Sequence, residues 1–358
     1  MVWVWVLFLV FVLLMLALDL GVFHREAHVV SMREALGWSA FWISLSLAFS
    51  IFIYFAYEGR WLGMGETLDA VDKTYNTGVP AAVKYLTGYI VEISLSMDNL
   101  FVILIIFRYF SVPPRYQHRV LFWGILGALV MRGVMIVVGA KLVAEFHWIL
   151  YLFAVFLIYA GVKMLTMGDE PVDPEQNYMI RLARRFFPVT GRYHGNHFVV
   201  RAGTSASREL EMPGALAVRD EAVEKTGAGT LMLTPLALAL IAVETTDVLF
   251  AVDSIPAIFA ITADPNLVFT SNVFAILGLR SLFFALASLM DKFRYLKVSL
   301  ALVLVLVGGK MLVADWFRDL MGPNYNFYLL GMVVFILAGG VVASLLAPAR
   351  EEPGPAES

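Results

Sequence analysis

The sequence predicts an all-α polytopic membrane protein with about nine transmembrane helices. Hydrophobic residues make up 60% of the 358 residues and charged residues only 15%, and the apolar residues come in long blocks. A block of about 20 apolar residues is what a helix needs to cross the hydrocarbon core of a bilayer. The net charge of −3 gives no indication of nucleic-acid binding, and without cysteine the chain has no disulfide, thiolate metal site or thiol redox motif.

The predicted spans follow one another along the chain. They cover residues 2–22, 39–57, 80–107, 119–143, 148–167, 231–262, 267–290, 295–314 and 327–347. The first begins apolar, without the basic stretch and small-residue cleavage site of a removable signal peptide, so we interpret it as a membrane helix. Lys and Arg concentrate in alternate connections, such as Arg108 to Arg119. This bias predicts an N-terminus outside and a C-terminus in the cytoplasm.

An internal repeat is visible when Asp98 is aligned with Asp253. The alignment places Glu92 on Asp247 and Asn99 on Ser254. It continues with further matched pairs, which are Arg132 with Arg280 and Lys163 with Lys310. We therefore predict two inverted three-helix repeats, helices 3 to 5 and helices 6 to 8, an arrangement typical of secondary transporters that bind substrate at the midplane.

This repeat divides the chain into five predicted regions. They are two flanking helices in 1–79, the first repeat in 80–167, a cytoplasmic loop in 168–230, the second repeat in 231–314, and a final helix with a disordered tail in 315–358. The 168–230 loop shows little helical periodicity, so we expect it to be only partly ordered.

The acids in the third and sixth spans indicate a function, because an ionised carboxylate at the membrane centre costs about 2.5–3.5 kcal/mol even on lenient scales. The alternative is a structural ion pair with Arg132 or Arg280. Six residues on a regular helix turn by about 240° beyond one full turn, so Glu92 and Asp98 would point to different faces. They can converge only if the helix is interrupted between them or if the two motifs wrap around a shared site. We expect interruptions near Asp98 and Asp253, with free carbonyl oxygens as further ligands.

The polar residues of these spans offer only oxygen ligands, which suit hard divalent cations such as Mn²⁺, Mg²⁺ or Ca²⁺. The predicted ligands of the transported ion are Glu92, Asp98, Asn99, Glu244, Asp247, Asp253 and Ser254. Arg132 and Arg280 are predicted counter-ions in the fourth and seventh spans. Lys163 and Lys310 lie nearer to span ends, where we expect them to extend toward the membrane surface.

Several stretches resemble the signature motifs of the TerC family of integral membrane proteins, and in particular its Alx-type branch. They are "VEISLSMDNLFV", "VETTDVLFAVDSIPAIFAIT", "SNVFAILGLR", "ALDLGVFHREAHVVSMREALGWS" and "HFVVRAG". The resemblance implies a divalent-cation exporter of the bacterial inner membrane, associated in the family with manganese efflux, alkaline-pH response and tellurite resistance. The family's acidic motif positions carry over onto the seven predicted ligands, and its "LDL" places Asp19 near the cytoplasmic end of the first span, as an access or gating residue or as part of a helix end.

These observations predict a non-enzymatic exporter without a resident cofactor, which moves Mn²⁺ by alternating access and for which coupling to H⁺ is natural. The predicted partners are the lipid bilayer, the cation and protons. One alternative is a membrane-stress or membrane-assembly protein, which has no need of acids in both repeats. An intramembrane aspartyl protease is less favoured, since neither Asp98 nor Asp253 lies in a Gly-x-Gly-Asp motif.

Overall fold

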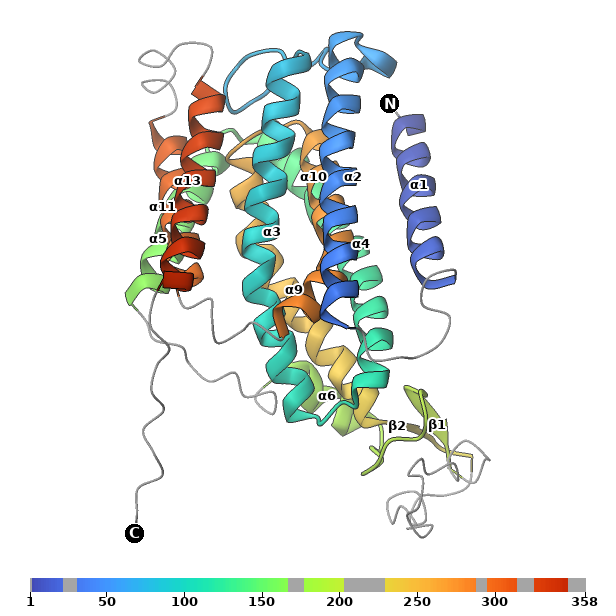
Figure 1. Cartoon of the computed structure of the whole chain (residues 1–358). Helices are drawn as coiled ribbons and strands as arrows, with labels where there is room; N and C mark the ends of the chain where they lie inside the picture. The colour runs from blue at the N-terminus through green and yellow to red at the C-terminus, as the bar shows by residue number, and fades with distance from the viewer. Residues whose placement is uncertain are drawn as a thin grey trace, which may run out of the picture.

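The computed structural model describes residues 2–21, 31–166, 177–202, 229–287, 295–313 and 325–346 as a bundle of long helices (Figure 1). Its long helices are α1 (Val2–Gly21), α2 (Met32–Glu58), α3 (Gly78–Tyr109), α4 (Pro114–Glu145), α5 (Ile149–Thr166), α9 (Pro235–Phe259), α10 (Pro265–Ala287), α11 (Leu296–Leu312) and α13 (Tyr325–Leu346). Its short elements are η1 (Trp61–Gly63), α6 (Tyr178–Phe186), β1 (Val199–Arg201) and β2 (Leu231–Leu233).

The all-α prediction is confirmed, and each of the nine predicted spans overlaps a helix. Among the described residues, seven helices are long and apolar enough to cross a membrane, namely α2, α3, α4, α5, α9, α10 and α13. The other two predicted spans correspond to α1, whose apolar part is described for Val6–Leu16, and α11, which has 17 residues. At about 1.5 Å per residue, α11 is somewhat shorter than the roughly 30 Å of hydrocarbon in a bilayer.

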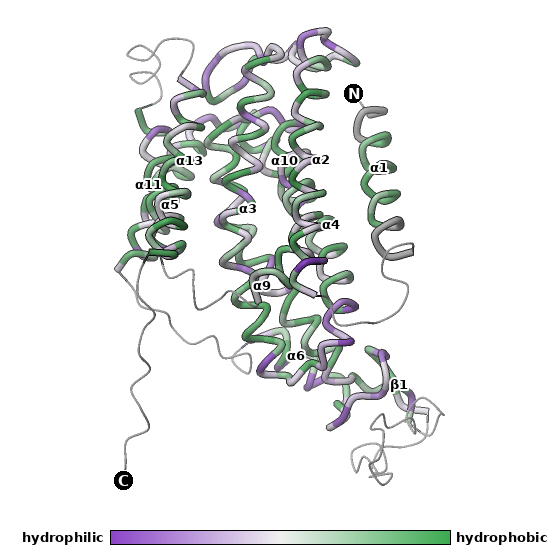
Figure 2. The backbone as a smooth tube through the Cα atoms, viewed as in Figure 1, coloured by the Kyte–Doolittle hydropathy of each residue, from purple (hydrophilic) through white to green (hydrophobic). Residues whose placement is uncertain are grey.

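The surface of the bundle is consistent with a lipid environment. Large apolar side chains are exposed along α2, α4, α5 and α13, as at Phe55, Val137, Val155 and Phe335. Figure 2 shows hydrophobic residues along the helices and hydrophilic residues at the two ends, near the α2–α3 connection and near α6 and β1. An apolar girdle of this extent is stable only where lipid replaces water.

Two groups of helices make up the interior. In the larger group α3 packs against α2, α9 and α10, and α4 packs against α9 and α10. In the smaller group α5 packs against α11, which also contacts α13. The side of the bundle formed by α2 and α10 is joined by α1, whose Phe8 ring lies 5.8 Å from that of Phe49 and 6.2 Å from that of Phe274.

The expectation that the third and sixth spans are interrupted is wrong. The helix α3 is continuous from Gly78 to Tyr109, and α9 is continuous from Pro235 to Phe259 with Pro256 inside it. Pro256 removes the hydrogen bond that an N–H at this position would have made to the Val252 carbonyl, yet the helix continues through it. An uninterrupted backbone keeps its other carbonyls in the helical ladder, so side chains must supply most ligands of any cation in these spans.

Two sequence expectations near the 168–230 loop also need correction. The helix α9 begins at Pro235 and not near 231, because residues 231–233 form β2 and pair antiparallel with β1. Thr234 caps α9, with Pro235 at the first helical position, where its missing N–H costs nothing. Within the loop, residues 178–186 form the helix α6, whose short amphipathic repeat the sequence reading overlooked.

The contact between α5 and α11 depends on two glycines in a reciprocal arrangement. A Cβ added to Gly161 would lie 2.7 Å from the Ala301 carbonyl oxygen, and one added to Gly308 would lie 2.8 Å from the Ala154 carbonyl oxygen. Both distances are too short for a real side chain, so the two backbones touch because both residues are glycine. Small residues permit the same close approach in membrane helices generally.

Replacing Gly308 with alanine is expected to destabilise the protein, because the added methyl group must separate α5 from α11. Overpacking of this kind costs about 1–3 kcal/mol, which exceeds the gain in helix propensity of about 1 kcal/mol. The matched control is Gly309→Ala, where nothing lies within 4 Å of the added Cβ and a small stabilisation is expected. Unfolding free energies in detergent would contradict the prediction if the two variants changed stability alike.

Candidate functional site

The first feature of the site is a buried arginine between two acids. Arg132 on α4 is 1% exposed, and its guanidinium forms an ion pair with Glu92 of α3. On its other side, Arg132 Nη2 lies 3.2 Å from Asp247 Oδ1 of α9, and Nη1 donates to Asn272 Oδ1 of α10 at 2.9 Å. Four helices are therefore joined by one guanidinium.

The two acids differ in how completely they are satisfied. Glu92 is fully buried, and its Oε1 also accepts a hydrogen bond from Ser96 Oγ at 3.2 Å. Its second oxygen, Oε2, has no hydrogen-bond partner in the part of the chain that the structure describes. The Asp247 side chain keeps 14% of its surface exposed. A buried carboxylate oxygen without a donor is costly, which is typical of a site that serves another purpose besides packing.

The second feature is a cavity of about 490 Å³ between α3, α5, α9 and α11. Three of the predicted ligands line it, namely Asn99, Asp253 and Ser254, together with Lys163 and Lys297. Asn99 Oδ1 and Ser254 Oγ are buried and have no hydrogen-bond partner within the described ranges. The cavity therefore presents unused oxygen atoms beside a carboxylate.

Glu244 and Arg280 lie apart from this cavity. Glu244 packs over Gly127 of α4, so closely that a Cβ on this glycine would overlap its carboxylate. Arg280 is buried on α10 and lines a space of about 30 Å³ together with Asp247. The side chains of Asp98 and Asp19 lie outside the described residues, although both positions are helical in the backbone.

No group of three or more His, Asp or Glu side chains is positioned to hold a metal ion among the residues that the structure describes. The six predicted ligands whose side chains are described are instead distributed over the Arg132 cluster, the cavity and the α4–α9 contact. Their function as ligands remains a prediction.

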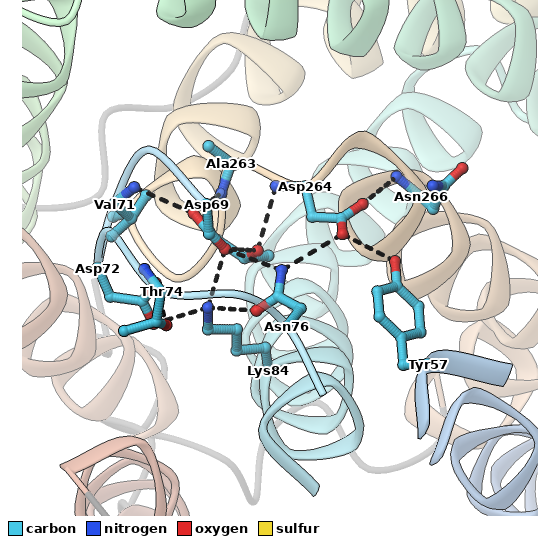
Figure 3. Close-up of polar contacts among 12 residues, drawn as sticks. Tyr57, Asp69, Val71, Asp72, Thr74, Asn76, Lys84, Ala263, Asp264 and Asn266 are labelled. Atoms are coloured by element: carbon cyan, nitrogen blue, oxygen red, sulfur yellow. Dashed lines mark hydrogen bonds and ion pairs between the residues drawn. The ribbon is translucent and has the colours of Figure 1, made fainter. Parts of the chain in front are cut away.

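A third feature, which the sequence reading missed, is a buried polar network at the opposite end of the bundle from α6 (Figure 3). Lys84 on α3 is 1% exposed, and its Nζ lies 2.9 Å from Asp69 Oδ2, 2.7 Å from Asp72 Oδ2 and 2.6 Å from Asn76 Oδ1. The two aspartates come from the α2–α3 connection. An ammonium ion thus holds this connection against the start of α3.

The same network reaches the second half of the chain. Asp69 accepts hydrogen bonds from the Thr262 hydroxyl and, at 2.9 Å, from the Ala263 N–H. Asp264 accepts from the Tyr57 hydroxyl at 2.9 Å and caps the start of α10 by accepting from the Asn266 N–H at 3.0 Å. These bonds connect α2, the α2–α3 connection and the α9–α10 connection into one unit.

The buried charges of the network are stabilised by neighbouring charged and hydrogen-bonding groups and not by solvent. Burial alone would raise the pKa of Asp69, but the Lys84 charge and the hydrogen bonds from Lys84, Thr262 and Ala263 outweigh it and lower this pKa to about 2. Burial raises the pKa of Asp264, and the hydrogen bond from Tyr57 only partly opposes that shift. The sequence signal for this network was the pair Asp69 and Asp72 in a short connection, followed by a lysine inside a span.

Lys310 also differs from its sequence expectation. It does not extend to the membrane surface, since it is 3% exposed and its Nζ donates to the Ala260 carbonyl at 3.1 Å. The ammonium lies 5.2 Å from the centre of the Tyr325 ring, a cation–π contact. The Tyr325 hydroxyl in turn donates to Asp72 Oδ2 at 2.9 Å, so α11 and α13 also join the network.

The fold and the site together define the class of the protein, which is a polytopic α-helical membrane protein with paired acids in its central helices. The chain belongs to the Integral membrane protein TerC family, whose model matches residues 77–352. It is 44% identical over 355 residues to "Uncharacterized membrane protein STKORF319" of Myxococcus xanthus, covering 98% of this chain and 96% of that protein. It is 41% identical over 315 residues to "Putative membrane-bound redox modulator Alx" of Escherichia coli K12, covering 88% and 87%.

The same name, with 41% identity over 315 residues, is carried by a relative from Salmonella typhi, of which this chain covers 86%. No solved structure matches the chain. The predicted family resemblance, including the similarity to Alx proteins, is therefore confirmed.

Proposed function

We propose that the protein is a secondary transporter that exports a divalent cation, with Mn²⁺ as the first candidate, through oxygen ligands in the middle of the bundle. The observation that carries the proposal is the way matched residues of the two predicted repeats meet. Glu92 and Asp247 occupy equivalent repeat positions and both contact Arg132. Asn99 and Ser254, the next equivalent pair, line one cavity beside Asp253.

The packing of the helices supports the inverted repeat. If α3, α4 and α5 correspond to α9, α10 and α11, a two-fold axis pairs the α3–α10 contact with the α4–α9 contact, and both are present. The two reciprocal glycine contacts between α5 and α11 follow the same symmetry, because Gly161 and Ala154 stand seven residues apart (161 − 154), as do Gly308 and Ala301 (308 − 301). Such symmetry gives a protein two equivalent ways to close around a midplane site.

Arg132 is the resident counter-ion in this proposal. It neutralises Glu92 and Asp247 while the cation is absent, and the acids become available as the guanidinium moves away. Since α3 and α9 are continuous, the ligands are side-chain oxygens, which suits a hard cation. The cation crosses from the cytoplasm to the outside as the two repeats rock about the site.

Proton coupling follows from the same chemistry. Protonating a carboxylate removes the negative charge that holds a dication, so an inward proton can release an outward cation. Glu92 and Asp253 are the acids best placed for this exchange, since one is fully buried and the other lines the cavity.

The relatives named as redox modulators suggest a competing function. A redox role in this chain would have to work without thiols of its own, because the sequence contains no cysteine. A membrane-stress or membrane-assembly role would leave the polar oxygen atoms of the cavity without a function. Both alternatives predict that acids in the spans can be neutralised with little effect on cation content.

The test is cellular manganese content in a host without its own manganese exporter, at equal membrane expression of each variant. The wild-type chain is expected to lower manganese content, and Asp98→Asn and Asp253→Asn are each expected to slow efflux by about tenfold or more, as loss of a metal-site group typically does. Glu145→Gln, an exposed acid at the end of α4, is the matched control and should export normally.

Normal efflux by both span variants would eliminate the carboxylate site. If the wild-type chain exports no manganese in this host or from loaded vesicles, the transport proposal fails for this cation, and the same vesicles loaded with Ca²⁺ or Mg²⁺ decide whether it fails for hard divalent cations altogether.

A further inference from the structure

The helix α6 has three distinct faces. At about 100° per residue, Tyr178, Met179 and Phe186 fall within one arc of about 100°. The arginines Arg181, Arg184 and Arg185 fall within another arc of similar width. Between these arcs lie Ile180 and Ala183. The sequence "YMIRLARRF" therefore separates apolar from basic residues almost completely.

The face with Ile180 holds α6 on the protein. Ile180 is 1% exposed within the main hydrophobic core, and Ala183 packs against the same core. The neighbouring helix is α9, which carries Glu244, Asp247 and Asp253. Asn177 caps the start of α6 by accepting from the Met179 N–H at 2.9 Å, which fixes where the helix begins.

The apolar arc is not used by the protein in the described part of the chain. Tyr178 is 67% exposed, Met179 is 45% exposed and Phe186 is 70% exposed. Three large apolar side chains on one short helix would be costly in water. Their position at the α6 end of the bundle, where hydrophobic helices give way to hydrophilic residues, is the level of a bilayer interface (Figure 2).

The basic arc indicates the chemistry of the partner, because its arginines attract negative charge. Arg181, Arg184 and Arg185 are all exposed, and the sequence of α6 contains no acidic residue. An apolar strip beside a basic strip is the pattern of helices that lie in the membrane surface, with aromatic rings among the upper acyl chains and arginines at the phosphates. A solvated helix has no need of the apolar strip, and a buried helix has no need of the basic one.

We propose that α6 is an interfacial helix that binds anionic phospholipid headgroups in the leaflet at its end of the bundle. Because α6 packs on α9, lipid charge at this surface acts on the helix that carries four of the predicted cation ligands. The proposal of a lipid-binding surface depends on the exposure, charge and position of the α6 side chains. It is therefore independent of whether the chain exports a cation.

The absence of cysteine allows a direct test in the full-length protein. Met179→Cys provides a single labelling site on the apolar arc for an environment-sensitive fluorophore. The labelled protein is reconstituted in phosphatidylcholine vesicles, with or without about one third phosphatidylglycerol, and quenched either by lipids brominated near the headgroup or by aqueous iodide. We expect quenching by the brominated lipids to dominate. We also expect phosphatidylglycerol to raise the ratio of lipid to iodide quenching about fivefold, which is the factor that corresponds to the attraction of a single arginine to an anionic surface.

The lipid dependence should disappear when Arg181, Arg184 and Arg185 are all changed to glutamine in the labelled protein. The matched control changes Arg60, Lys73 and Lys141 to glutamine, three exposed cations at the other end of the bundle, and should keep it. If the arginine variant does not fold, the labelled protein with intact arginines still decides, since its response to phosphatidylglycerol must weaken at 1 M salt, where the screening length is about 3 Å.

Two outcomes would overturn the proposal. Equal access of iodide in both vesicles would make α6 a solvated helix. Protection of the label from both quenchers would mean that protein covers the apolar arc, either residues 203–228 of this chain or a second copy.

Discussion

Replacing Arg132 with methionine is expected to lower the free energy of unfolding by about 3–5 kcal/mol, the cost of removing one partner from a buried ion pair. Methionine fills much of the same volume, so the loss comes from charge and not from a cavity. Glu92, which is fully buried, would face Asp247 with no cation between them. Unfolding in detergent by denaturant titration measures the loss. Arg33→Met, at an exposed position of α2, is the control and should change stability little.

The same variant distinguishes a structural arginine from a counter-ion that makes way for a cation. If a dication binds between Glu92 and Asp247, Mn²⁺ should stabilise Arg132→Met more than it stabilises the wild-type chain, because binding to the folded state adds stability by mass action. The double variant Glu92→Gln with Arg132→Met should lose this response. No difference in the response to Mn²⁺ between Arg132→Met and the wild-type chain would leave Arg132 with a structural role only.

Replacing Lys84 with methionine is expected to cost a similar amount, about 3–5 kcal/mol, at the other end of the bundle. The variant leaves Asp69 and Asp72 buried without the ammonium that lies within 3 Å of both. Changing both aspartates to asparagine in the same chain should recover much of the loss, because no buried charge is then left unpaired. Lys141→Met, at an exposed position near the same end, is the control.

The Lys84→Met variant should also differ from the wild-type chain in how its stability changes with pH. Lys84 holds the pKa of Asp69 at about 2, below its unfolded value of about 3.9, so the stabilisation is complete above the unfolded pKa and is lost as pH falls toward 2. Without Lys84, burial dominates and raises the folded pKa above the unfolded one. The variant should therefore become more stable on mild acidification. A parallel acid profile for both proteins would show that Lys84 does not set the charge state of Asp69.

Much of the architecture was accessible from the sequence because membrane helices have a length and composition imposed by the bilayer. Each predicted span overlaps a helix, and the family resemblance depended on long motifs. The interruptions expected at Asp98 and Asp253 were inferred from the angle between Glu92 and Asp98 on one helix. The structure instead brings together acids from two continuous helices, because Arg132 on α4 contacts both Glu92 of α3 and Asp247 of α9.

The sequence signalled three members of the Lys84 network, but it could not show which distant residues complete it. Its members are separated by up to 253 residues, the distance from Asp72 to Tyr325, and individually each is an ordinary polar residue near a helix end. Only folding brings them together, and only their burial makes their hydrogen bonds and charges strong.

The sequence by itself determined that the chain lies in a membrane, which segments become its helices, and which acids stand at equivalent places in a predicted repeat. These properties depend on local composition and spacing, because a segment crosses the bilayer only if it is long and apolar enough and satisfies its own backbone hydrogen bonds. Tertiary structure alone decided that Arg132 joins Glu92 to Asp247, that Asn99 and Ser254 share a cavity, and that Lys84 is paired with two aspartates. Such pairings depend on which helix faces meet, and no single helix carries that information.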